Sequence, residues 1–91
     1  MKLEDFEIKL GELYDELPEE IKDRFSLNLL EYDPTNSNVF AYWTNMLPNA
    51  VTFVYETFKN HGDFSDDHLR RVMKHEFEHV LMGTKHSEHK K

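Results

Sequence analysis

The first seventeen residues show apolar positions at steps of three and four, the spacing of one face of an amphipathic helix. The residues on that face are Leu3, Phe6, Leu10, Leu13, Tyr14 and Leu17. Gly11 lies within the stretch and weakens the helix somewhat. Pro18 suits a first helical turn, and Glu19 and Glu20 are favourable near its positive end. The pattern predicts a helix that covers a sheet, a break near Pro18 and one or two further turns.

The middle of the chain contains three segments with the composition of β-strands. They are SLNLLEY (26–32), NVFAYWT (38–44) and AVTFVYETF (50–58), rich in β-branched and aromatic residues. The connectors DPTNSN and NMLPN are typical of turns. Because short turns join the three segments, we expect an antiparallel meander. Its aromatic residues are expected in the core and in cross-strand pairs.

A second helix is expected after the loop KNHGDF. Ser65 is a good N-cap, and two aspartates follow it where the helix dipole favours anions. Gly83 is a natural terminator, so the predicted helix covers 66–82. Its apolar face consists of Leu69, Val72, Met73, Phe77, Val80 and Leu81. The predicted order is helix, three strands, helix, in a single α+β domain over residues 1–91, because two cores would each be too small.

This last helix carries the pattern H-E-x-x-H at His75, Glu76 and His79. At about 100° per residue, His79 lies about 40° from His75 and one turn along, so both imidazoles can reach one zinc ion. Glu76 projects beside them, where it can accept a proton from activated water. It also falls between Val72 and Leu69 on the flank of the apolar face, where an unsatisfied carboxylate is costly. The position suits a catalytic glutamate better than a structural one.

The pattern supplies only two zinc ligands, whereas catalytic sites usually have three protein ligands and a water. Gly83 would allow the chain to turn back, which makes His86 our preferred third ligand. Glu88 and His89 are the alternatives.

Two further histidines are weaker candidates for the zinc site. His68 precedes His75 by seven residues, about 10 Å along the helix axis, which is too far to share the ion. We expect it at the surface or supporting a ligand. His61 is expected to be an ordinary loop histidine, with a weaker possibility that it stabilises an oxyanion.

Composition narrows the chemistry further. There is no cysteine, which excludes thiolate zinc sites and leaves His, Asp and Glu as the strong ligands for a transition metal. The net charge of −7 argues against nucleic acid as a partner. No apolar run approaches the roughly 20 residues needed to span a bilayer, and MKLEDFEIKL is unlike a signal peptide. We therefore expect a cytoplasmic protein without membrane insertion. Its small core could gain stability from bound metal or from a homodimer.

The segments DELPEEI, LPNAVTFVYETF and LRRVMKHEFEHVL, followed by Gly and His, resemble the minimal zinc peptidases called minigluzincins and related small zincin-like proteins. The match in order and spacing covers nearly the whole chain, and H-E-x-x-H is its specific motif. The resemblance implies a backing helix, a three-stranded sheet and an active-site helix, with zinc on His75, His79 and a downstream histidine, here His86. It also implies that some members are latent. The metzincin pattern is disfavoured, because Gly83 comes one residue too late.

These observations predict a zinc-dependent endopeptidase, or its latent form, with Glu76 as the catalytic base and Zn²⁺ as cofactor. Its substrate would be an extended peptide paired with an exposed strand edge, most plausibly that of segment 50–58. One alternative is a non-catalytic zinc-binding or partner-binding domain, perhaps a dimer, whose site is closed by a fourth protein ligand such as His89. The second alternative is a small acidic scaffold protein that binds no metal.

Overall fold

Four helices and three strands make up the part of the chain that the computed structural model describes. It describes residues 1–36 and 38–89, with side chains as far as Gly83. The elements are α1 (Leu3–Asp15), α2 (Glu19–Arg24), β1 (Ser26–Leu30), β2 (Ala41–Thr44), β3 (Leu47–Val54), α3 (Tyr55–His61) and α4 (Asp66–His89). The α+β class is therefore confirmed, and so is the break at Pro18.

The sheet is mixed, so the predicted antiparallel meander is wrong. Its strand order is β1-β3-β2. β1 pairs with β3 in parallel, with Ser26 opposite Ala50, whereas β2 pairs with β3 antiparallel. The physical reason lies in β3, whose Val51, Phe53 and Val54 side chains are fully buried. A strand that is apolar on both faces is most stable in the middle of a sheet.

The segment 50–58 is also not a single strand. The strand ends at Val54, and Tyr55 begins the short helix α3. Tyr55 and Phe58 both pack against Phe6 of α1, with ring centroids 5.4 and 5.1 Å apart. Three residues apart, they share one face of a helix, which an extended strand would not allow. Gly62 ends α3 in the left-handed conformation, at φ 67°.

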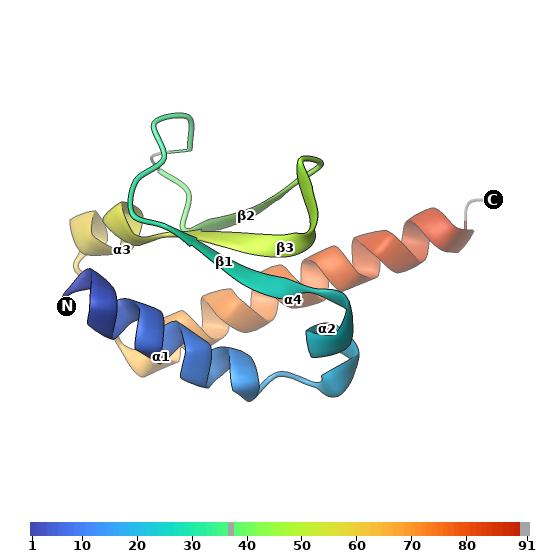
Figure 1. Cartoon of the computed structure of the whole chain (residues 1–91), viewed down its shortest axis with the longest axis horizontal. Coiled ribbons are helices and arrows are strands. Elements are labelled where there is room, and N and C mark those ends of the chain that lie inside the picture. Colours follow the sequence, from blue (N-terminus) through green and yellow to red (C-terminus); the bar gives the residue numbers. More distant parts are fainter. Residues whose placement is uncertain (37, 90–91) are drawn as a thin grey trace.

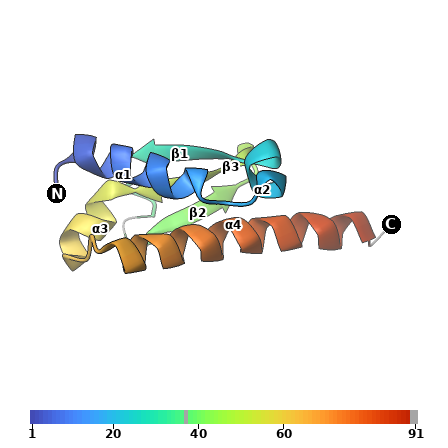
Figure 2. The same cartoon turned by 90° about the horizontal axis from the view of Figure 1, so that it is seen from below.

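Two long helices cover one face of the sheet (Figure 1). Seen from below, α1 runs along β1 and α4 runs along β2 (Figure 2). The core between these layers contains the predicted faces of both helices, including Phe6 and Leu10 of α1 and Met73 and Phe77 of α4, each at most 1% exposed. Within the described residues, no helix is long and apolar enough to cross a membrane.

The β1–β2 connection is held by a buried carboxylate. Asp33 accepts hydrogen bonds from the backbone N–H groups of Thr35 (2.9 Å) and Asn36 (3.2 Å) and from the Tyr42 hydroxyl on β2. The Tyr42 hydrogen bond is the main reason why the pKa of Asp33 lies below its usual value. These bonds fasten the long connection to the edge strand β2.

We expect Asp33→Asn to destabilise the protein at neutral pH. A carboxylate with a lowered pKa in the folded state contributes stability above its unfolded pKa, and that contribution is lost as the pH falls through the folded value. The difference between wild type and Asp33→Asn should therefore shrink below about pH 4. Urea denaturation at pH 7 and pH 3 measures it, with the exposed Asp23→Asn as control. A pH-independent difference would contradict this assignment.

Candidate metal centre on helix α4

The start of α4 is capped as the sequence predicts. The Ser65 hydroxyl accepts a hydrogen bond from the backbone N–H of His68 at 3.3 Å, and Asp63 accepts one from the Ser65 hydroxyl at 2.8 Å. The predicted apolar face is buried at Leu69, Met73, Phe77, Val80 and Leu81 and partly buried at Val72. This face fixes the rotation of the helix, and with it the direction of the H-E-x-x-H side chains.

His75 and His79 lie side by side on the exposed surface of α4. Their ring centroids are 6.1 Å apart and the ring planes differ by 23°. Two imidazoles on one tetrahedral zinc ion, with Zn–N bonds of about 2.0–2.1 Å, would have centroids about 5 Å apart. Rotating the two side chains so that the distance between the ring centroids falls by about 1 Å would bring the pair to that spacing. The donor set and its placement therefore fit a shared zinc ion.

Glu76 is half-buried beside this pair. On the helix it lies about 100° from Phe77, which contacts Tyr14 of α1 with ring centroids 5.6 Å apart. The α4 residues beside α1 include Met73 and Lys74, and Glu76 lies on the other side of Phe77 from Lys74, on the flank toward β2. Burial raises the pKa of the Glu76 carboxyl, and the neighbouring His75 and His79 oppose that rise. Among the described residues, none donates a hydrogen bond to it. It therefore forms no structural ion pair within the described part of the chain.

The prediction that Gly83 ends the helix is wrong, because α4 continues to His89. Gly83 is exposed and keeps a helical conformation, and it does not adopt the left-handed conformation with which a glycine ends a helix. On an uninterrupted helix, residue 86 lies about 10 Å along the axis from His79. The side chains of His86, Glu88 and His89 lie outside the described residues. Within the described part, no three histidine or acidic side chains gather as a metal site.

The other two histidines are held near the start of α4. His68 Nδ1 lies 3.1 Å from the Asp63 carbonyl, and its ring packs edge-on against Phe40 at 5.0 Å. His61 is the last residue of α3, not a loop residue, and its Nδ1 lies 2.9 Å from the Thr57 carbonyl. It packs against the same Phe40 ring with the centroids 4.9 Å apart and the ring planes tilted by 57°. Both side chains pack against Phe40 near the start of α4, and the structure does not bring them to the His75–His79 pair.

The strand edge beside α4 belongs to β2. The predicted use of segment 50–58 as a substrate-binding edge is wrong, because β3 is paired on both sides. β2 contacts α4, and its outer side has no partner strand in the described part of the chain. Trp43 on this strand is 42% exposed and donates a hydrogen bond from Nε1 to the Pro48 carbonyl at 2.9 Å. Sequence reasoning placed every aromatic residue in the core or in cross-strand pairs and missed this edge, which only the strand order reveals.

Comparison with known proteins identifies no relative of this chain. The chain matches no protein-family model, no curated protein and no solved structure. The resemblance to minigluzincins thus rests on the order of the segments and on H-E-x-x-H alone. A function for this chain is best argued from the α4 site itself.

Proposed function

We propose that this protein is a zinc-dependent peptidase. One observation carries the proposal: two imidazoles one helical turn apart, with ring centroids at 6.1 Å, stand beside a half-buried glutamate without a hydrogen-bond donor among the described residues. A glutamate kept only for solubility would lie at an exposed position of α4, as Glu78 does. The arrangement matches what metal-assisted hydrolysis requires, namely ligands on a rigid element and a base next to them.

Each side chain of the motif has a separate role in this proposal. His75 and His79 hold the metal, and His86 is the proposed third ligand. Because α4 continues through Gly83, this ligand requires the last turns of α4 to unwind when the metal binds. When bound, zinc supplies a Lewis acid that lowers the pKa of water and polarises a peptide carbonyl. Glu76 accepts the proton of the attacking water and passes it to the leaving amine.

The substrate in this proposal is an extended peptide. A peptide that adds to the outer edge of β2 gains main-chain hydrogen bonds and lies along α4, because β2 contacts that helix. Its scissile carbonyl can then approach the flank that carries Glu76. The half-exposed Trp43 indole offers an apolar contact for one of its side chains.

Zinc should stabilise the folded protein through His75 and His79. A ligand present at a hundredfold excess over its Kd adds about 2.7 kcal/mol, which raises Tm by roughly 11–22 °C in a domain of this size. We expect His75→Ala and His79→Ala each to remove this shift, and Glu78→Ala, an exposed neighbour, to keep it. Differential scanning calorimetry with and without ZnCl₂ measures it. An equal Tm with and without zinc in the wild type would contradict the metal site.

A second candidate is a non-catalytic zinc site shared between two copies. The continuation of α4 past Gly83 favours it, because a straight helix leaves His75 and His79 without a third ligand from the same chain. Two such pairs would complete a tetrahedral His₄ site. Sedimentation with zinc separates the candidates: a peptidase binds one zinc per chain as a monomer, whereas the shared site gives a dimer with one zinc per two chains. His86→Ala weakens zinc binding only in the first case.

A further inference from the structure

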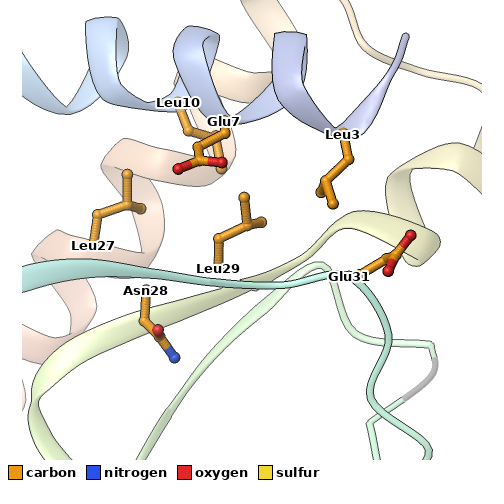
Figure 3. Close-up of a pocket in the computed structure, with 7 residues that line it drawn as sticks. All are labelled: Leu3, Glu7, Leu10, Leu27, Asn28, Leu29 and Glu31. Atoms are coloured by element: carbon orange, nitrogen blue, oxygen red, sulfur yellow. The ribbon is translucent and has the colours of Figure 1, made fainter.

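A groove of about 370 Å³ lies between α1 and the edge strand β1, opposite the β2 edge (Figure 3). Its apolar part is formed by Leu3 and Leu10 of α1 and by Leu27 and Leu29 of β1. Glu7 of α1 and Glu31, just after β1, add carboxylates. We call this the β1 groove. Its leucines and its two acids together define what it could bind.

The groove runs along a free strand edge. β1 is paired with β3 on one side only, and its other side has no partner strand among the described residues. Alternate residues of such an edge present unpaired N–H and C=O groups, which are a template for another extended chain. A segment that pairs there gains main-chain hydrogen bonds regardless of its sequence.

Every second residue along β1 points a side chain into the groove. Leu27, Leu29 and Glu31 alternate along the chain and all line the groove, whereas Asn28 points away from α1 (Figure 3). Successive members of such a set are about 6.6–6.8 Å apart. An added strand has the same repeat, so its every second side chain meets these residues. One apolar side chain fits against Leu27 and Leu29, and long cationic side chains two positions away can extend to Glu31 beyond Leu29 and to Glu7 above the two leucines (Figure 3).

The charge of the groove selects the partner. Glu7 and Glu31 are exposed, and neither has an ion-pair partner within the described residues. Lys9, on the same helix, is directed to the other side, where it pairs with Asp66 at 3.2 Å. A second copy of this chain would bring the same acids together at a net charge of −7, which disfavours self-pairing. A cationic segment is favoured.

We propose that the β1 groove binds an extended segment of a partner protein in which an apolar residue is flanked, two positions away on each side, by lysine or arginine. The apolar side chain packs against Leu27 and Leu29, and the cations pair with Glu7 and Glu31. This docking site is separate from the α4 site, since β1 and β2 are opposite edges of the sheet. It therefore goes beyond the proposed peptidase function and does not depend on it.

The probe is the palindromic peptide acetyl-Ser-Lys-Thr-Leu-Thr-Lys-Ser-amide, whose lysines and leucine share one face of a strand. Acetyl-Lys-Ser-Thr-Leu-Thr-Ser-Lys-amide has the same composition and charge, but its lysines lie on the opposite face from the leucine. ¹⁵N–¹H correlation spectra of the full chain should show shifts at residues 3–10 and 26–31 with the first peptide and weaker binding of the second. Equal affinity for the two peptides, no binding of either, or shifts confined to α4 would overturn the proposal.

A matched pair of variants tests the charge. Glu7→Lys lies in the groove, whereas Glu12→Lys makes the same change on the exposed outer face of α1. We expect Glu7→Lys to weaken binding of the first peptide about fivefold and Glu12→Lys to change it less than twofold. Circular dichroism checks that both variants fold. Equal losses in both variants indicate non-specific attraction and overturn the proposal, as does a β1-mediated dimer in sedimentation that excludes the peptide.

Discussion

Glu76→Gln is expected to lower kcat/KM for peptide hydrolysis by about 10²–10⁴-fold while leaving one zinc bound per chain. The amide keeps the size of the side chain but cannot accept a proton. His75 and His79 keep their places, because the buried face of α4 sets their direction and does not include residue 76. Cleavage of a fluorogenic peptide, with zinc measured by atomic emission on the same preparation, gives both quantities.

Glu78→Gln is the matched control for this experiment. It makes the same substitution two residues further along α4, at an exposed position. Its activity should equal that of wild type. If Glu76→Gln and Glu78→Gln behave alike, Glu76 is not the base. If wild type and both variants bind zinc without hydrolysing any peptide, the non-catalytic candidate replaces the peptidase.

Local signals were enough to place the helix that carries the site. The Ser65 cap, the aspartates after it and the apolar repeat from Leu69 to Leu81 all act within a few turns of backbone. The rotation of α4 follows from the same repeat, so the exposed His75–His79 pair and the half-buried Glu76 could be anticipated from residue spacing. The same holds for α1, whose Phe6 and Leu10 are fully buried as expected.

Features that depend on tertiary contacts could not be predicted from such local sequence signals. Short turns favoured a meander, but burying β3 on both faces places it in the middle of the sheet, between β1 and β2. Tyr55 and Phe58 fit a strand by composition, and their packing on Phe6 makes them helical. Glycine is common at the end of a helix, yet α4 continues through Gly83. The third zinc ligand depends on that last point, which is why the pair could be placed and the full site could not.

Phe77→Ala is expected to destabilise the protein by about 3–5 kcal/mol, a large share of the total stability of a small domain. Phe77 is fully buried, with its ring centroid 5.6 Å from that of Tyr14 on α1 and 6.5 Å from that of Phe53 on β3. Truncation therefore opens a cavity where both helices meet the sheet. Urea denaturation of the metal-free protein measures the loss, with the adjacent, exposed Glu78→Ala expected within about 0.5 kcal/mol of wild type.

The same substitution connects the core to the site, because Phe77 lies between Glu76 and His79 in sequence and fixes the rotation of α4. A helix that settles into the cavity turns Glu76 relative to β2, so Phe77→Ala should also lower peptide hydrolysis, whereas zinc binding, whose proposed ligands all lie on α4, should change little. Phe77→Leu fills most of the volume and should recover both properties in part, which keeps the test informative if the alanine variant does not fold. A loss below about 1 kcal/mol in Phe77→Ala would mean that α4 does not pack on the sheet through this residue.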